Sequence, residues 1–214
     1  MKRIYLIRHA ESEDNSFNLE SRDDTVLSEK GRQQAEHLSK RFTSIDVDKI
    51  ISSSFKRTMQ TVEAISAIKN IRVEISDLFA ERKVPSEILG KSFDSAELQN
   101  VYKTLRENYF ISEARHSDEE TFEDIKIRAR KALVYLEENN AEHIVIACHG
   151  MFIVMLISYI TFGESVGPRD FVNMFNTFKI SNTGITLCEY DQKNKTEEIT
   201  GWRLITWNDQ IHLN

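Results

Sequence analysis

The sequence predicts an α/β fold: a three-layer α/β/α sandwich whose central sheet is mainly parallel and carries an antiparallel edge strand. Short apolar runs typical of buried strands alternate with longer segments that carry one apolar face, as amphipathic helices do. Strands buried on both faces read as near-continuous apolar runs and belong to parallel sheets covered by helices. The chain has 214 residues, two prolines and no repeat or linker, so we expect one domain over residues 1–214.

Each expected element depends on a local pattern. RIYLI predicts the first strand, and LSEKGRQQAEHLSKRF predicts a helix with Ser28 as its N-cap. MFIVMLISYI predicts a buried helix that is too short to span a bilayer, which needs about 20 residues. We expect strands at residues 3–7, 47–52, 72–75, 143–147, 179–181, 184–190 and 201–207, and helices at residues 27–42, 55–68, 94–110, 121–138 and 151–160.

Three further segments carry expectations of their own. The last two strands are expected to pair around the polar turn DQKNKTEE. Residues 81–120 are charged and too long for a plain connection, which predicts a lid or cap over a site. The aromatic residues between 171 and 178 are expected in the core.

Composition limits the kinds of partner and the compartment. A net charge of −6 argues against nucleic acid or an anionic membrane surface as a partner. The apolar run at residues 4–7 is shorter than the roughly 7–15 residues of a signal peptide. Cys148 and Cys188 lie far apart, as is typical of reduced thiols rather than a disulfide framework. A cytoplasmic protein acting on a small molecule is therefore expected, while the oligomeric state is not indicated.

Basic side chains follow three of the expected strands. Arg8 and His9 end the first strand, and Cys148 and His149 follow the strand HIVIA. Arg57 lies in the first turn of the helix that follows the second strand. If these strands are parallel, the four side chains meet at one edge of the sheet, beside helix N-termini that favour anions. Arginine binds phosphate oxygens bidentately, and a neutral imidazole nitrogen can attack phosphorus. These residues predict a site that handles phosphate.

The same residues lie in a series of motifs that resembles the histidine phosphatase superfamily, the phosphoglycerate mutase-like proteins. RHAESEDN resembles the family's R-H-G-E-[ST]-x-x-N signature. LSEKGRQQA, SSSFKRTMQTVEAI, LFAER, IVIACHG and SNTGITLCEY are similar to its later blocks, in the family's order. The resemblance covers most of the chain and implies a phosphoglycerate mutase-like fold.

The resemblance also implies which residues carry the chemistry. His9 is the expected nucleophile, which becomes phosphohistidine. Glu81, in LFAER, is the expected proton donor to the leaving oxygen and later the base for water. Glu87, in VPSEILG of the same loop, competes for this role. A carboxylic acid in this place contributes roughly 10²–10⁴-fold to the rate.

The remaining matched residues are expected to bind phosphate. The resemblance implies that Arg8, Arg57 and His149 hold the phosphoryl oxygens and that Asn15 helps to line the pocket. Cationic side chains can neutralise the phosphoryl group without a metal or other cofactor. The family usually has glycine where this chain has Ala10, and a methyl group there crowds the backbone if the position needs a positive φ.

The expected function is a metal-independent phosphatase that hydrolyses a small phosphomonoester through phosphohistidine. A phosphoglycerate mutase is the alternative within the family, although residues 81–120 show no match to the mutase segment. A non-catalytic phosphate-binding member of the fold is a second alternative. A metallohydrolase using His9 and His149 is a third, although no ligand pair at zinc spacing is present.

Overall fold

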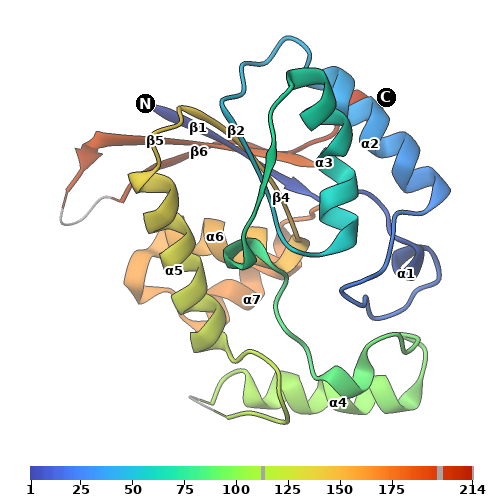
Figure 1. Ribbon diagram of the computed structural model, residues 1–214. Helices are drawn as coiled ribbons and strands as arrows, with labels where there is room; N and C mark the ends of the chain where they lie inside the picture. The colour runs from blue at the N-terminus through green and yellow to red at the C-terminus, as the bar shows by residue number, and fades with distance from the viewer. Residues whose placement is uncertain (112–113, 197–199, 214) are drawn as a thin grey trace.

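A six-stranded sheet forms the middle layer of the computed structural model, which describes residues 1–111, 114–196 and 200–213 (Figure 1). The strand order is β3-β2-β4-β1-β5-β6. The first four are parallel, β5 is antiparallel to β1, and β6 is antiparallel to β5. The strands are β1 (Lys2–Arg8), β2 (Lys49–Ser52), β3 (Val73–Ile75), β4 (His143–Cys148), β5 (Ile185–Lys195) and β6 (Thr200–Asp209). The predicted mainly parallel sheet with an antiparallel edge is confirmed.

Helices cover both faces of this sheet (Figure 1). They are α1 (Glu13–Ser16), α2 (Glu29–Arg41), α3 (Lys56–Lys69), α4 (Ala96–Asn108), α5 (Phe122–Glu138), α6 (Gly150–Phe162) and α7 (Pro168–Thr177), with short 3₁₀ turns η1 (Asp77–Phe79), η2 (Ser86–Ile88), η3 (Gly163–Ser165) and η4 (Ile211–Leu213). Helices α2 and α3 pack on one face, and α5, α6 and α7 contribute to the core on the other. The predicted three layers are confirmed.

The core is divided between the two faces because side chains alternate along each strand. In β1, Tyr5 and Ile7 join the cluster under α2 and α3, whereas Ile4 and Leu6 join the cluster under α5 and α6. Helix α6 is apolar on all sides, and its side chains are buried from Phe152 onward for two turns. The strands and α6 therefore form a fixed base for the residues that follow them.

Most predicted elements lie within one or two residues of their expected bounds. The Ser28 hydroxyl accepts a hydrogen bond from the Gly31 N–H at 3.0 Å, which confirms the expected N-cap of α2. The expected strand at residues 179–181 is wrong. The Lys179 carbonyl accepts from Trp207 Nε1 at 2.8 Å, and the Ser181 N–H donates to Asn208 Oδ1 at 2.9 Å. Side chains thus form hydrogen bonds with backbone groups that would pair with a neighbouring strand in a sheet.

Two other expectations need correction near the C-terminal end of the chain. Strand β5 continues to Lys195 through most of the expected polar turn, and residues 197–199 lie outside the described residues. The aromatic segment forms helix α7, which buries Phe171 but leaves Phe175 43% and Phe178 36% exposed. These two rings are not core residues.

The cap segment is residues 81–120, of which the structure describes 81–111 and 114–120, and its elements η2 and α4 lie apart from the sheet (Figure 1). Their apolar side chains form a small cluster of their own: Ile88, Leu98, Val101 and Leu105. Backbone hydrogen bonds tie the cap segment to the loop after α1. They run from Glu20 N to Lys91 O at 2.9 Å, from Gly90 N to Glu20 O at 2.8 Å and from Phe93 N to Asn18 O at 3.0 Å. That the cap segment acts as a lid stays a prediction.

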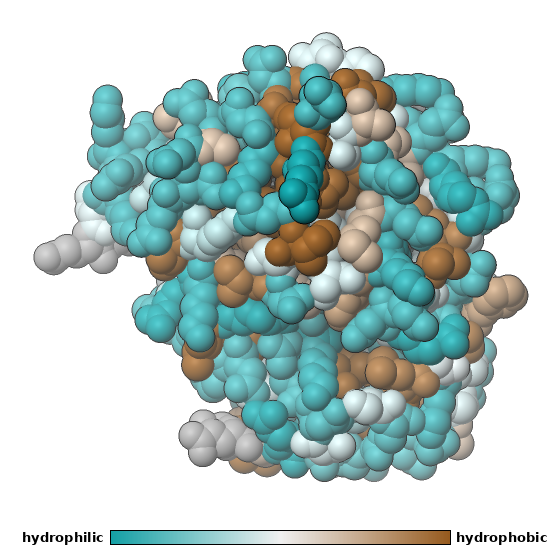
Figure 2. All heavy atoms as spheres, viewed as in Figure 1, coloured by the Kyte–Doolittle hydropathy of each residue, from teal (hydrophilic) through white to brown (hydrophobic). Residues whose placement is uncertain are grey.

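The face drawn in Figure 2 is mostly hydrophilic, with hydrophobic atoms in separate groups. Large apolar side chains are exposed on several elements, such as Phe17, Ile127 and Leu204. Scattered apolar residues of this kind are normal on a folded surface. None of the helices in the described residues is long and apolar enough to cross a membrane.

We expect Ile146→Ala in β4 to lower the free energy of unfolding by about 2–5 kcal/mol, because it opens a cavity in a fully buried strand. Ile127→Ala is the matched control, since this side chain is 44% exposed on α5. Urea unfolding measures both free energies. Equal small losses for the two variants would contradict the placement of Ile146 in the core.

Candidate functional site

The candidate site lies beyond the carboxyl ends of β1, β4 and β2. The sheet's hydrogen bonds continue one residue past β1 and one residue past β2. His9 N donates to the Cys148 carbonyl at 3.0 Å, and Ser53 N donates to the Ala147 carbonyl at 3.1 Å. The rings of His9 and His149 lie together, with centroids 5.2 Å apart. The parallel sheet therefore brings residues from three distant parts of the sequence to one edge.

His9 is buried and held in one tautomer. Its Nδ1 lies 2.8 Å from the Ala10 carbonyl oxygen, which can only accept, so Nδ1 carries the hydrogen. Burial, and then the charges of Arg57 and Arg8, hold the pKa of His9 well below its usual value. A neutral ring protonated at Nδ1 leaves the Nε2 lone pair free. Asn182 Nδ2 further fixes this residue by donating to the His9 carbonyl at 2.9 Å.

Ala10 fits its position because the backbone there does not have a positive φ. The residue is fully buried, and its methyl group packs with Leu27 and Ala35. Its N–H donates to Thr61 Oγ1 at 2.9 Å. The methyl group thus fills a small apolar pocket, and the crowding considered from the sequence does not occur.

Arg8 and Arg57 have unused hydrogen-bond donors. Arg8 Nη1 donates to the Ile180 carbonyl at 2.7 Å, and Arg57 Nη1 donates to the Arg22 carbonyl at 2.8 Å. The Nε of each is buried and has no partner among the described residues. Burial lowers the pKa of both guanidinium groups, that of Arg57 to about 10, so both stay charged at neutral pH. Buried charged donors without partners favour an anionic ligand.

His149 is fully buried, with both ring nitrogens engaged. Arg57 Nη2 lies 3.3 Å from Nδ1, and Ser53 Oγ lies 2.8 Å from Nε2. Because a guanidinium can only donate, Nδ1 holds a lone pair and Nε2–H donates to Ser53. Burial, and then the charge of Arg57, hold the pKa of His149 well below its usual value. In this neutral form His149 has no N–H free for a phosphoryl oxygen, so its contact with phosphate stays a prediction.

Glu81 follows η1, and its carboxylate lies at the N-terminus of α6. It accepts hydrogen bonds from Met151 N at 3.2 Å and Phe152 N at 3.1 Å. A helix N-terminus is a favourable place for a carboxylate. Glu87 is exposed on η2, where its carboxylate lies 2.8 Å from His116 Nε2. Of the two competing carboxylates, the structure places Glu81 beside the phosphate-binding candidates.

Asn15 lies in α1, where its side chain accepts from Ser12 N at 3.3 Å and completes a capping box. Its Nδ2 also donates to Ser21 Oγ at 3.3 Å. These bonds hold the loop that follows His9. Asn15 therefore serves the local turn and also lines the cavity described next.

A cavity of about 800 Å³ brings these groups together. The predicted residues on its wall are Arg8, His9, Asn15, Arg57 and Glu81, whereas the predicted His149 is buried and does not belong to the described wall. The loop after α1, the cap segment and the end of α7 add Leu19, Glu20, Arg82, Phe93, Tyr102, Phe175 and Phe178. No three or more histidine, cysteine or carboxylate side chains gather as metal ligands would within the described parts of the chain.

Sequence reasoning assigned no role to several residues that support the site. Thr58 shares a hydrogen bond of 2.7 Å with Ser53 and so extends the chain of contacts behind His149. Ser53 lies in SSSFKR and Asn182 in SNTGITLCEY, two of the quoted motifs, so the motifs marked their positions but not their contacts. Phe175 and Phe178 carried no signal beyond their aromatic character.

We expect the free energy of unfolding to fall as the pH drops below about 6.5, the ordinary histidine pKa of the unfolded chain. The folded-state pKa values of His9 and His149 are lowered, so the unfolded state binds more protons in this range. The loss approaches about 1.4 kcal/mol per histidine per pH unit. Urea unfolding between about pH 7.5 and about 5.5 measures it. His9→Asn should flatten the slope, and an unchanged slope would contradict a buried neutral His9.

Comparison with known proteins gives one family over nearly the whole chain. The model of the histidine phosphatase superfamily (branch 1) matches residues 4–209. A Schizosaccharomyces pombe protein named a probable phosphatase is 27% identical over 220 residues, covering 99% of this chain and 95% of its own. An Erwinia tasmaniensis protein named a probable phosphoglycerate mutase is 26% identical over 219 residues, covering 100% of this chain and 95% of its own.

A solved structure agrees with this assignment at the level of the fold. The structure of YhfR from Bacillus stearothermophilus superposes with a TM-score of 0.81 at 21% identity, and the match covers 100% of both chains. The family match, the phosphoglycerate mutase-like fold and the cluster of histidines and arginines at the sheet edge agree. The chain belongs to branch 1 of the histidine phosphatase superfamily.

Proposed function

We propose that the protein is a metal-independent phosphatase that hydrolyses a small phosphomonoester through a phosphohistidine on His9. One observation carries the proposal: a neutral His9 with a free Nε2 lone pair shares the cavity with two arginines that have unused donors. A neutral imidazole is a nucleophile, and the unused N–H groups of Arg8 and Arg57 suit phosphoryl oxygens. We place the protein in the cytoplasm, which its buried free cysteines favour.

In the first step, His9 Nε2 attacks phosphorus and the bond from phosphorus to the substrate oxygen breaks. This step needs Glu81 in its protonated form, which gives its proton to that oxygen so that it leaves as an alcohol. Arg8 and Arg57 offset the charge on the phosphoryl oxygens, and His149 contributes through its contact with Arg57. In the second step, Glu81 takes a proton from water as the water attacks phosphorus. The phosphorus–nitrogen bond breaks, and inorganic phosphate and neutral His9 are released.

We favour hydrolysis over a mutase reaction because residues 81–120 show no match to the mutase segment. A mutase acting on a phosphoglycerate must also bind a second anionic group of the same substrate. Glu20 lies in the cavity wall, and its carboxylate accepts from the Tyr102 hydroxyl. Arg82, Lys83 and Lys179 lie in the same wall, so its charge alone does not decide between the two reactions. The mutase alternative predicts transfer between positions of a phosphoglycerate without release of phosphate, which product analysis distinguishes.

His9→Ala should reduce phosphate release to background and abolish the acid-labile phosphoenzyme, because no other group would supply the nucleophile. His143→Ala is the matched control, since His143 begins β4 at the opposite end of the strand from the site. Release of inorganic phosphate and acid lability of the trapped phosphoprotein measure the effect. More than a few per cent of residual activity in His9→Ala would exclude His9 as the nucleophile.

Glu81→Gln should lower kcat/KM for an alkyl phosphate by about 10²–10⁴-fold and for p-nitrophenyl phosphate much less. An alkoxide needs a proton to leave, whereas p-nitrophenolate does not. Glu87→Gln is the control and should leave both values unchanged. An equal loss on both substrates after Glu81→Gln, or a selective loss after Glu87→Gln, would reject Glu81 as the acid.

Retention of activity in EDTA and inhibition by vanadate would oppose the metallohydrolase alternative.

A further inference from the structure

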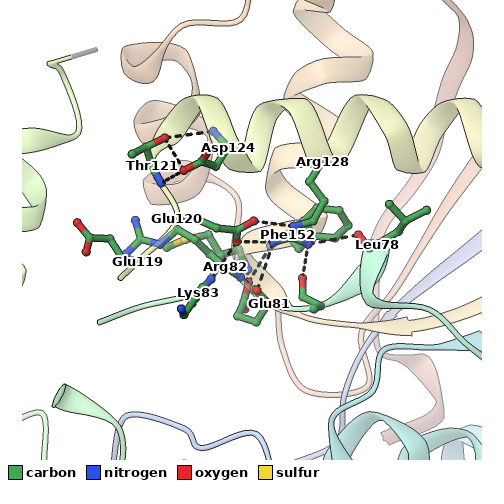
Figure 3. Close-up of polar contacts among 12 residues, drawn as sticks. Leu78, Glu81, Arg82, Lys83, Glu119, Glu120, Thr121, Asp124, Arg128 and Phe152 are labelled. Carbon is green, nitrogen blue, oxygen red and sulfur yellow. Dashed lines mark hydrogen bonds and ion pairs between the residues drawn. The ribbon is translucent and has the colours of Figure 1, made fainter. Parts of the chain in front are cut away.

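The loop that carries Glu81 is held by one arginine from a different part of the fold. Arg128, on α5, donates from Nη1 to the carbonyls of Leu78 at 3.2 Å and Ala80 at 2.7 Å. Its Nη2 donates to the carbonyl of Glu81 itself at 3.3 Å. Figure 3 shows the side chain reaching from the helix to this loop. A single guanidinium thus fixes the backbone that leads into the proposed acid.

The same guanidinium also fixes the chain on the other side of Glu81, through Glu120. Arg128 Nε lies 2.8 Å from Glu120 Oε1, and Arg128 Nη2 lies 2.7 Å from Glu120 Oε2, which is a bidentate pair. Glu120 Oε2 accepts from Lys83 N at 2.9 Å, and Glu120 N donates to the Lys83 carbonyl at 2.9 Å. The pair is mostly buried, with side-chain exposures of 16% and 20%. Figure 3 shows this network around Glu81.

The guanidinium of Arg128 has no donor left for a substrate. It carries five N–H groups. Two contact Glu120, and three contact the carbonyls of Leu78, Ala80 and Glu81. The arginines of the phosphate-binding candidates differ, since their Nε groups are unpartnered among the described residues. Arg128 therefore suits a structural task at the site although it lies in the cavity wall.

A third contact links Arg128 to the carboxylate of Glu81. The guanidinium carbon lies 4.3 Å from the centre of the Phe152 ring. The Phe152 N–H is one of the two α6 donors to the Glu81 carboxylate. Arg128 thus contacts both the backbone of Glu81 and the residue that orients its side chain.

We propose that Arg128, held by Glu120, is a positioning residue that keeps Glu81 in place to protonate the leaving oxygen. The inference depends on the proposed function, in which Glu81 is the acid. A misplacement of about 1 Å at a reacting group can cost about 10²-fold in rate. Loss of Arg128 frees the backbone before and after Glu81 but leaves His9, Arg8 and Arg57 in place. The damage should therefore depend on how strongly the leaving group needs a proton.

The experiment compares Arg128→Met with Arg130→Met. Arg130 is an exposed residue two positions further along α5, and its Nη1 lies 3.5 Å from Glu164 Oε1. The value of kcat/KM is measured for an alkyl phosphate and for p-nitrophenyl phosphate, because it reports the steps through departure of the leaving group. Arg128→Met should lower the alkyl value by about 10–100-fold and the aryl value by less than about threefold. Inhibition by vanadate should stay unchanged, and Arg130→Met should match the wild type in all three measurements.

Two further variants keep the test decisive if Arg128→Met does not fold. Arg128→Lys keeps the positive charge but loses the planar guanidinium that binds Glu120 bidentately. Glu120→Gln keeps the side-chain shape but loses the negative charge. Each should show a smaller alkyl-selective loss. Equal losses on both substrates, weaker vanadate inhibition or unchanged kinetics in the folded variants would overturn the positioning role.

The wild type and Glu81→Gln, measured in the same assays, separate this inference from the proposed function. If the wild type releases no phosphate, or if Glu81→Gln loses activity equally on both substrates, the proposed function fails and the inference fails with it. If Glu81→Gln is alkyl-selective but the Arg128 variants are not, only the positioning role is rejected.

Discussion

The hydrogen bond from the His9 N–H to the Cys148 carbonyl joins the proposed nucleophile directly to the central strands of the sheet. The matching bond from the Ser53 N–H to the Ala147 carbonyl does the same for the residue that contacts His149. The site is thus the last row of a parallel sheet rather than a set of flexible loops. The other groups of the cavity surround these strand ends, which are held in place because helices pack closely on both faces of the sheet.

The charges at this edge are costly without a ligand. Arg8 and Arg57 are desolvated and leave buried Nε groups unpaired, and each lies close enough to lower the pKa of His9. Isolated buried donors of this kind are unfavourable in a folded protein. Binding of an anion satisfies them. Burial, and then the same two cations, keep the nucleophile neutral before binding, and the cations compensate the phosphoryl charge afterwards.

The sequence indicated the strand ends well, because a polar Arg8-His9 pair after RIYLI and a Cys148-His149 pair after HIVIA break strong apolar patterns. It could not indicate the contacts of Arg128. Three of its partners are backbone carbonyls, which any residue provides, so no motif marks them. The strand predicted at residues 179–181 was wrong for a related reason, since side chains distant in the sequence form hydrogen bonds with the backbone there. Local patterns report burial and capping, whereas contacts between distant segments depend on the assembled fold.

The joint between the cap segment and the loop after α1 consists of main-chain hydrogen bonds between Asn18–Glu20 and Gly90–Phe93. The positive φ values of Asn18 and Gly90 restrict which residues can stand at those two positions. Leu19, Glu20 and Phe93 line the cavity, and Glu20 and Phe93 also contact Tyr102 of α4 through a hydrogen bond and a ring stack. The same few residues therefore hold the cap segment and form part of the cavity wall, so a change of the wall at Glu20 or Phe93 also changes how α4 is held.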